Sequence, residues 1–171
     1  MASVYLLTGS PGTGKTTVIR QAIARSKAKA GGFYTEEIRS GGDRQGFRIV
    51  TLDEQNAVLA HVDFSSRYKV SKYGVDVLNL ENVGVAAINQ AIEDSELIVI
   101  DEIGKMELFS PGFRQAVLKA IDSGKKVLGT IMLSPHPFAD EIKRHPEVKV
   151  VELTRASHEQ VLREILDWLK S

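Results

Sequence analysis

Apolar and polar positions along the chain follow two periods, one typical of strands and one typical of helices. Val4–Thr8 is a short apolar run and predicts a strand. From about Lys15 to Lys29, apolar residues recur on one face, as in an amphipathic helix. The same spacing predicts later helices over Glu81–Asp94, from Pro111 up to Gly124, over Phe138–Arg144 and from Ser157 onward.

Continuous apolar runs between these helices predict buried strands. Leu97–Ile100 is apolar at every position, which suits a strand buried on both faces of a parallel sheet. Lys126–Leu133 and Val148–Thr154 predict two more strands. Strands that alternate with helices indicate an α/β fold with helices on both faces of the sheet. Ligands in such folds lie at the carboxyl ends of the parallel strands.

One region breaks the alternation of strands and helices. Phe33–Ser40 and Gly46–Leu52 read as two strands joined by the turn residues Gly41-Gly42-Asp43, which predicts an antiparallel hairpin. Ala57–Val62 is a possible third strand. Residues 63–76 are polar and read as a loop with a short strand near Tyr73. The sheet is therefore expected to be mixed, mostly parallel, with an antiparallel hairpin.

Capping residues and apolar faces refine the helices. Ser110 followed by Pro111 predicts a helix start, and Gly124 predicts its end. Ser157 with Gln160 has the spacing of a capping box. The faces expected to be buried carry Val18, Ile19, Ala22 and Ile23; Val83, Ala87, Ile88, Ala91 and Ile92; Phe113, Val117, Leu118 and Ile121; and Val161, Leu162, Ile165, Leu166 and Leu169.

Composition narrows the class of protein. The 171 residues predict one domain spanning 1–171, and the 43% hydrophobic content is that of a globular chain. Net charge is zero, so a general nucleic-acid binder is disfavoured. There is no cysteine and no apolar stretch near the roughly 20 residues of a membrane span. A soluble, cytoplasmic protein is expected, and its four scattered histidines do not suggest a metal site.

The strongest motif is a phosphate-binding loop. Gly9-Ser10-Pro11-Gly12-Thr13-Gly14-Lys15-Thr16 matches G-x-x-x-x-G-K-[ST], between a predicted strand and a predicted helix. Glycines let backbone N–H groups wrap phosphates, and the helix N-terminus favours anions. Lys15 is expected to reach the β- and γ-phosphates of a nucleotide, and the Thr16 hydroxyl to ligate Mg²⁺.

A second motif stands at the end of the buried strand. Asp101 follows Leu97–Ile100 and is the carboxylate expected to hold Mg²⁺. Glu102 follows directly and can accept a proton from an attacking water. If the strand alternates, the two acids face opposite ways, which divides their roles between metal and water. Glu102 and Lys15 are therefore the predicted catalytic residues.

Several further residues have open roles. Thr130 ends the neighbouring strand, where its hydroxyl either senses the γ-phosphate or the attacking water, or bonds to backbone. Lys105 either reaches a phosphate or is a surface lysine. Glu37 and Arg39 share one face of the hairpin and Glu36 lies on the other; a solvated position is favoured over one at the mouth of the site.

No arginine is assigned by the sequence as an arginine finger. Arg67, Arg114 and Arg155 are candidates, and a partner subunit is another source. Arg155 also follows the last strand, where contact with a nucleotide base is expected only by analogy of fold. The segment Arg67–Tyr73 is basic and contains tyrosine, but an ordinary loop is favoured over a nucleic-acid site there.

A family resemblance covers most of the chain. The run Asp101-Glu102-Ile103-Gly104-Lys105-Met106-Glu107-Leu108, the GSPGTGKTT loop and Gly32-Phe33-Tyr34-Thr35-Glu36-Glu37-Ile38-Arg39 resemble the small nucleoside-triphosphatases described from thermophiles. That family includes the vertebrate cancer-related nucleoside-triphosphatase. Shorter likenesses occur at Gly46-Phe47, at Tyr73-Gly74-Val75-Asp76 and at Leu128-Gly129-Thr130-Ile131.

The resemblance implies a RecA-like, three-layer P-loop NTPase fold with an added strand and a catalytic glutamate. It also implies slow, Mg²⁺-dependent hydrolysis of ATP, GTP and other nucleoside triphosphates. Two segments would contact the nucleotide. They are Gly9, Ser10, Pro11, Gly12, Thr13, Gly14, Lys15, Thr16 and Thr17, and Leu97, Ile98, Val99, Ile100, Asp101, Glu102, Ile103 and Gly104.

The leading interpretation is therefore a nucleoside-triphosphatase with Mg²⁺ as cofactor and low base selectivity. A nucleotide or small-molecule kinase is the alternative, because the length of this chain and its phosphate loop are equally typical of such kinases. A regulatory switch associated with nucleic acid is a third interpretation. The zero net charge of the chain argues against it. Nucleoside triphosphates are the expected ligands, no membrane is expected as a partner, and no protein partner is indicated.

Overall fold

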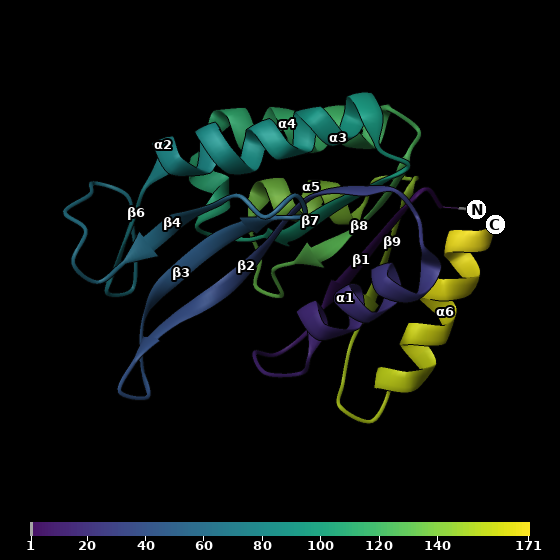
Figure 1. The fold of residues 1–171 in the computed structure, drawn as a ribbon, viewed down its shortest axis with the longest axis horizontal. Helices are drawn as coiled ribbons and strands as arrows, with labels where there is room; N and C mark the ends of the chain where they lie inside the picture. Colours follow the sequence, from purple (N-terminus) through teal and green to yellow (C-terminus); the bar gives the residue numbers. More distant parts are fainter. Residues whose placement is uncertain (1) are drawn as a thin grey trace.

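A computed structural model describes residues 2–171 as three layers, with helices on both faces of a central sheet (Figure 1). The sheet has nine strands in the order β5-β6-β4-β3-β2-β7-β8-β1-β9. This arrangement confirms the α/β class and the mixed sheet. No helix in residues 2–171 combines the length and apolar character that crossing a membrane requires.

The parallel part of the sheet forms the core. Its strands are β1 (Val4–Thr8), the first part of β2 (Ala30–Ser40), β7 (Leu97–Ile103), β8 (Lys126–Ile131) and β9 (Val148–Glu152). β1 is buried at every residue, as a strand covered on both faces must be. The carboxyl ends of β1, β7 and β8 therefore meet at one edge of the sheet.

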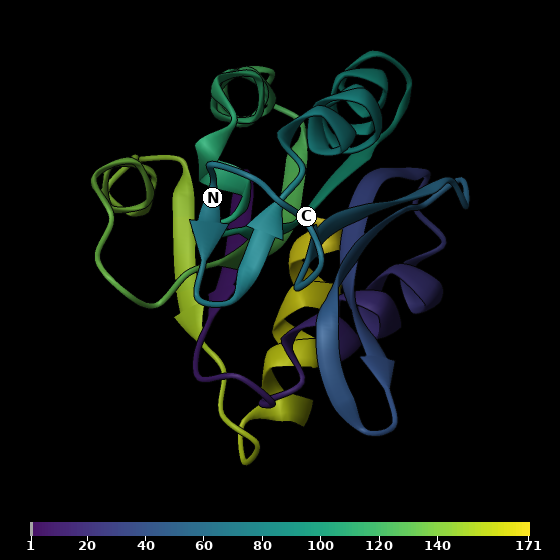
Figure 2. The same ribbon diagram turned by 90° about the vertical axis from the view of Figure 1, so that its left-hand side faces the viewer.

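Strand β2 changes partner along its length. Ala30–Phe33 pairs in parallel with β7, and Phe33–Ser40 pairs antiparallel with β3 (Asp43–Thr51). The antiparallel part continues through β4 (Asn56–His61), β6 (Tyr73–Val75) and β5 (Lys69–Val70). It is therefore larger than the predicted hairpin, and the short strand expected near Tyr73 is confirmed. The β2–β3 hairpin projects beyond the parallel core (Figure 2).

Helices α1 (Lys15–Ser26) and α6 (His158–Lys170) pack together on one face of the sheet. The other face carries a continuous helical stretch, α2 (Val77–Asn79), η1 (Leu80–Val85) and α3 (Ala86–Asp94). The remaining elements on that face are the short turn η2 (Glu107–Phe109) and the helices α4 (Pro111–Asp122) and α5 (Pro137–Lys143). A separate apolar core lies under each layer of helices.

Several predicted boundaries are corrected by local contacts. The helix expected from Glu81 begins at Val77, because the Asp76 side chain caps it by accepting a bond from Asn79 N. Helix α1 ends at Ser26, since Lys27 is left-handed at φ 57°. Strands β8 and β9 each end two residues before the predicted ends, Leu133 and Thr154.

The predicted start of α4 is confirmed, because the Ser110 side chain accepts a bond from Phe113 N. The predicted capping box at α6 does not form: Ser157 Oγ accepts from Thr154 N, and no side-chain bond caps the helix. Among the predicted buried residues, Leu118 is 39% exposed, which the apolar pattern did not reveal. Trp168 is buried on α6, whereas Leu166 and Leu169 are only partly buried.

Candidate active site

A cleft of about 490 Å³ opens where the carboxyl ends of β1, β7 and β8 meet. The residues that line it come from three parts of the chain. From the loop after β1 they are Gly9, Ser10, Pro11, Gly12, Lys15 and Thr16. From the ends of β7 and β8 and just beyond they are Asp101, Glu102, Thr130, Met132, Leu133 and Ser134. From the β2–β3 hairpin they are Thr35, Glu36, Glu37, Arg44 and Phe47.

The loop after β1 needs glycine at its two ends. A Cβ on Gly9 would lie 2.7 Å from the Leu153 carbonyl oxygen, so no other residue fits there. Gly14 has φ 86° and ends the loop at the N-terminus of α1, where no side chain caps the helix. The first N–H groups of α1 therefore have no intrahelical partner and are available to an anion.

Lys15 lies folded across this loop. Its Nζ donates to the carbonyl oxygens of Gly9 and Ser10, each at 3.0 Å. These acceptors are neutral, and a lysine ammonium bonds more strongly to a charged oxygen. The Lys15 side chain is thus held at the cleft by contacts that an anion can replace.

Asp101 is a buried residue of the cleft and accepts hydrogen bonds from three threonines. Its Oδ2 accepts a bond of 2.6 Å from Thr16 Oγ1, and its Oδ1 accepts a bond of 2.7 Å from Thr130 Oγ1. Thr35 Oγ1 donates to the Asp101 backbone carbonyl at 3.2 Å. Burial raises the pKa of the Asp101 carboxyl, and the bonds from Thr16 and Thr130 oppose that rise. Thr130 therefore orients Asp101 rather than bonding to backbone.

We expect Thr130→Val to lower the free energy of unfolding by about 1.5–3 kcal/mol, because it removes a hydrogen bond to a buried carboxylate. Thr130→Ser keeps the hydroxyl and removes one buried methyl group, so its cost should be only about 0.8 kcal/mol. Urea unfolding of both variants at neutral pH measures the difference. Equal losses in the two variants would contradict the role assigned to the hydroxyl.

Glu102 lines the same cleft as Asp101. A regular strand would point consecutive side chains to opposite faces. The pairing of β7 with β8 is irregular between Ile100 and Ile103, so the alternation on which the predicted division of roles depended does not persist. Burial raises the pKa of Glu102, the Asp101 carboxylate raises it further, and Lys15 opposes the rise. A carboxylate of raised pKa is a stronger proton acceptor.

Glu107 is a third carboxyl group near these two. It is only 3% exposed and lies in η2, on the segment that follows β7. Burial raises its pKa well above the usual value, and the charge of Glu102 adds to the rise. A raised pKa favours the neutral form of Glu107, because its ionised form would add a third negative charge near Asp101 and Glu102.

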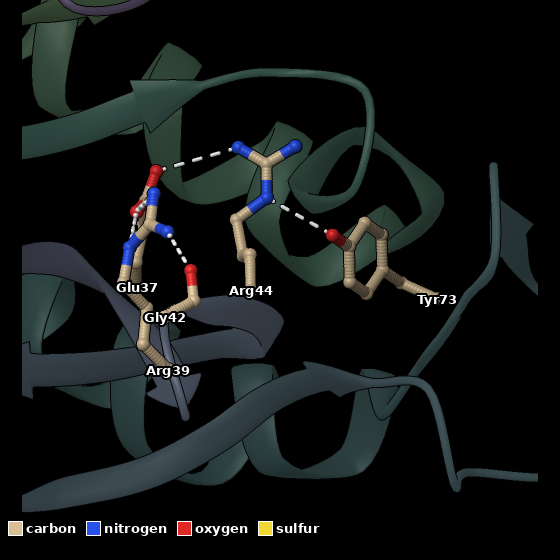
Figure 3. Close-up of polar contacts among 5 residues, drawn as sticks. All are labelled: Glu37, Arg39, Gly42, Arg44 and Tyr73. Carbon is tan, nitrogen blue, oxygen red and sulfur yellow. Dashed lines mark hydrogen bonds and ion pairs between the residues drawn. The ribbon is translucent and has the colours of Figure 1, made fainter.

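The hairpin acids lie at the mouth of the cleft, which corrects the prediction that they are simply solvated. Glu36 pairs with Arg20 of α1 at 2.9 Å. Glu37 points the other way and accepts hydrogen bonds from both Arg39 and Arg44 (Figure 3). Burial raises the pKa of Glu37, but the hydrogen bonds and charges of Arg39 and Arg44 together outweigh burial and hold the pKa below the usual value.

Some residues predicted to contact the nucleotide lie outside the cleft. Leu97–Ile100 is at most 1% exposed within the sheet and does not line the cleft, so contact of this segment with a nucleotide stays a prediction. Ile103 and Gly104 are buried beyond the two acids. Thr13, Gly14 and Thr17 belong to the loop and the start of α1 but are not among the residues that line the cleft within 2–171.

The predicted cations, Lys15 apart, are not among the residues that line the cleft within 2–171. Lys105 and Arg155 are exposed. Arg67 stacks on the Tyr68 ring and donates to its hydroxyl, and Arg114 donates to the Leu108 carbonyl. Neither Arg67 nor Arg114 lines the cleft in the part of the chain that the structure describes. Arg155 follows Leu153, whose carbonyl touches the phosphate loop, so its contact with a base stays a prediction.

Three hairpin residues of the cleft were not singled out from the sequence: Thr35, Arg44 and Phe47. The alternation of β3 could have placed Arg44 on one face but gave no reason to aim that face at the loop after β1. Met132, Leu133 and Ser134 were missed because β8 ends before them.

The oxygen donors at Asp101 fit Mg²⁺. Thr16 Oγ1 and Asp101 Oδ2 are 2.6 Å apart and so face the same point. Mg²⁺ takes oxygen ligands, and in phosphate-handling sites one or two protein oxygens are completed by substrate phosphates and water. Over residues 2–171, no group of three or more His, Cys, Asp or Glu side chains is placed to hold a metal ion. The donor set therefore suits a metal ion that arrives with a phosphate ligand.

Comparison with known proteins adds to this geometry. A family model described as NTPase matches residues 4–166 of the chain. The chain belongs to the NTPase family. This membership confirms the resemblance drawn from the motifs, and with it the expectation that the chain is a nucleoside-triphosphatase.

Relatives within the NTPase family match over nearly their full length. The nucleoside-triphosphatase THEP1 of Thermotoga maritima is 47% identical over 165 residues, which cover 96% of this chain and 94% of that protein. The human cancer-related nucleoside-triphosphatase is 37% identical, covering 100% of this chain and 98% of that protein.

Solved NTPase structures resemble this one closely. The crystal structure of THEP1 from Aquifex aeolicus has a TM-score of 0.90 at 36% identity and covers 98% of this chain and 99% of that chain. The solution structure of the human cancer-related enzyme has a TM-score of 0.83, also at 36% identity, and covers 99% and 98% of the two chains.

Proposed function

We propose that this chain is a P-loop NTPase with a RecA-like fold that hydrolyses nucleoside triphosphates to diphosphate and phosphate with Mg²⁺. One observation carries the proposal: Lys15, Thr16, Asp101 and Glu102 line a single cleft, although they come from two distant parts of the sequence. A lysine, a hydroxyl and two carboxylates are the groups that bind a triphosphate, hold its metal and activate water.

In this proposal the phosphate loop holds the triphosphate. The N–H groups at the start of α1 and the glycine-rich backbone bind phosphate oxygens. Lys15 leaves the carbonyls of Gly9 and Ser10 for the β- and γ-phosphates, because a phosphate oxygen carries charge and a carbonyl does not. Thr13 and Gly14 end the loop and Thr17 lies in the first turn of α1, and all three contribute through their backbone N–H groups.

Glu102 accepts a proton from the attacking water. The water oxygen forms a bond to the γ-phosphorus, the bond from that phosphorus to the bridging oxygen breaks, and the diphosphate leaves. Glu102 is placed for this role because it lines the cleft beside Asp101 and has a raised pKa. The proton goes to its carboxylate and the electron pair goes to the leaving diphosphate.

Thr16 and Asp101 would hold Mg²⁺, which when bound neutralises phosphate charge. Thr130 and Thr35 act on Asp101 from two sides: Thr130 bonds its carboxylate and Thr35 bonds its backbone carbonyl. They fix the carboxylate in one orientation before the nucleotide arrives, so little reorganisation accompanies binding.

Base selectivity is expected to be low. The cleft residues with assigned roles all act on phosphates or the metal, and discrimination between bases requires polar groups aimed at base edges. We expect ATP, GTP, CTP and UTP to be hydrolysed with specificity constants within about two orders of magnitude of one another. Phosphate release from the four nucleotides, with Mg²⁺ and with a chelator, tests the proposal.

The same assay separates hydrolysis from transfer to an acceptor. Hydrolysis yields one free phosphate for each diphosphate, whereas a kinase without its acceptor yields neither. No Mg²⁺-dependent phosphate release from any of the four nucleotides would overturn the proposed function. A preference of roughly 10⁴-fold for one base, about 5.5 kcal/mol, would overturn the low selectivity alone.

A further inference from the structure

The end of the β2–β3 hairpin places two arginines directly opposite each other. Arg39 on β2 is the register partner of Arg44 on β3. Like charges at directly opposed positions destabilise an antiparallel pair. The carboxylate of Glu37 forms an ion pair with each guanidinium group, so one negative charge lies between two positive charges (Figure 3). The single charge of Glu37 therefore does not balance the charges of both arginines.

Glu37 does not hold the two arginines equally. Arg39 Nη2 lies 2.6 Å from Glu37 Oε2, and its Nη1 also donates to the Gly42 carbonyl at 2.8 Å. Arg44 Nη1 lies 3.3 Å from Glu37 Oε1, which is long for a bond between charged groups. Arg39 is therefore tied into the hairpin end, whereas Arg44 is weakly held by its acid.

Arg44 is also the arginine that faces the cleft. It lines the cleft with Lys15, Asp101 and Glu102, and within residues 2–171 no other arginine does. On its other side lies a second hollow of about 430 Å³, lined by Arg39, Lys72, Tyr73 and others. Arg44 therefore borders both hollows, so there is open space on two sides of its side chain.

The aromatic side chains of Phe47 and Tyr73 orient the Arg44 guanidinium. Its Nε donates to the Tyr73 hydroxyl at 2.9 Å, and its Cζ lies 5.2 Å from the Phe47 ring centroid and 5.7 Å from that of Tyr73. Contacts of this kind hold a guanidinium near a fixed plane while leaving other N–H groups to bind a partner. The Nε end of the Arg44 side chain is therefore held by Tyr73, whereas its terminal N–H groups can change partner.

We propose that Arg44 is a catalytic arginine supplied by the chain itself. When a triphosphate binds, its guanidinium leaves Glu37 for the γ-phosphate and stabilises the negative charge that develops there during transfer to water. A γ-phosphate offers a stronger acceptor than a carboxylate already bonded to Arg39. This inference rests on the proposed function and adds to it the arginine that the sequence left unassigned.

The test compares two arginines that share one acid. The full chain is prepared as Arg44→Ala, Arg44→Lys and, as matched control, Arg39→Ala. Single-turnover hydrolysis of ATP with Mg²⁺ gives the rate, and titration with a nonhydrolysable ATP analogue gives ground-state affinity. Formation of a complex with ADP, Mg²⁺ and fluoroaluminate reports the transition-state geometry.

We expect Arg44→Ala to lower the single-turnover rate roughly 10³-fold or more, as removal of an arginine finger does. Its affinity for the analogue should change less than tenfold, and its fluoroaluminate complex should be lost. Arg44→Lys should remain impaired, because an ammonium cannot make the bidentate contact. Arg39→Ala should stay within threefold of the unmodified protein in all three measurements.

Two results would overturn the inference. One is an Arg44→Ala rate within threefold of the unmodified protein. The other is an equal loss for Arg39→Ala and Arg44→Ala, which would mean that both act by shaping the hairpin. Either result leaves hydrolysis by the unmodified protein intact, whereas failure of the proposed function would show as no hydrolysis by that protein itself.

Discussion

Glu102→Gln should lower the single-turnover rate of ATP hydrolysis by roughly 10²–10⁴-fold, the usual effect of losing a general base. That range corresponds to about 3–5.5 kcal/mol of activation free energy. Glutamine keeps the shape of the side chain and its place in the cleft but cannot accept the proton of water. Nucleotide affinity should change little or rise slightly, because a negative charge near the γ-phosphate is removed.

Asp101→Asn provides the contrast for this measurement. Its carboxylate accepts bonds from Thr16 and Thr130 and is the proposed Mg²⁺ ligand, so its loss should weaken Mg²⁺-dependent binding as well as turnover. Equilibrium binding at saturating Mg²⁺ distinguishes the two variants. A Glu102→Gln protein within threefold of the original rate would rule out Glu102 as the base. Glu37 and Glu36, which line the cleft, would then be the next candidates, whereas Glu107 lies outside that lining and its raised pKa favours the neutral form.

Lys15→Ala should weaken triphosphate binding by roughly 10–100-fold, because hydrogen bonds to charged groups contribute about 1.5–3 kcal/mol. Most of the hydrolytic activity should be lost with it, since Lys15 is proposed to contact the γ-phosphate. The fold should persist, because the hydrogen bonds of Lys15 Nζ go to the carbonyls of Gly9 and Ser10 in its own loop and not to another element of the fold. Calorimetric titration with an ATP analogue measures affinity, and circular dichroism measures folding.

Lys119→Ala is the matched control for the change at Lys15. Lys119 is an exposed lysine of α4, on the layer of helices that does not contain the phosphate loop. Its removal changes the net charge by the same amount and should leave affinity unchanged. Unaltered affinity of a folded Lys15→Ala protein would contradict the assignment of the phosphate site.

The features that could be predicted from the sequence are those determined by neighbouring residues in the chain. The phosphate loop is one continuous segment, recognised by the spacing of its glycines, lysine and threonine. Its place between β1 and α1 could therefore be predicted. Asp101 was found because a buried strand leads directly to it. The proximity of Thr130 followed from the parallel order of strands, although its bond to the Asp101 carboxylate did not.

The features that escaped prediction depend on contacts between distant segments. Arg44 reaches the cleft because β2 leaves the parallel sheet at Phe33 and carries β3 past the phosphate loop, which no local pattern reveals. The irregular pairing after Ile100 places Glu102 beside Asp101, and it exists only in the register of β7 against β8. Ser157 has the spacing of a capping box, but Thr154 takes its hydroxyl instead.

The partner change of β2 at Phe33 divides the cleft into two parts that mutation can alter separately. The proposed phosphate and metal ligands lie in the loop after β1, at the start of α1 and on β7, next to the parallel sheet. Arg44 lies on a hairpin whose turn is Gly41 and Gly42, in the antiparallel part of the sheet. A longer, shorter or stiffer turn there would move the arginine and leave the phosphate loop where it is. The lifetime of the bound triphosphate would then change without any change in how tightly it is held. Sequence changes in this one turn would therefore be enough to convert a hydrolase into a protein that keeps its triphosphate bound without hydrolysing it, and to reverse that conversion.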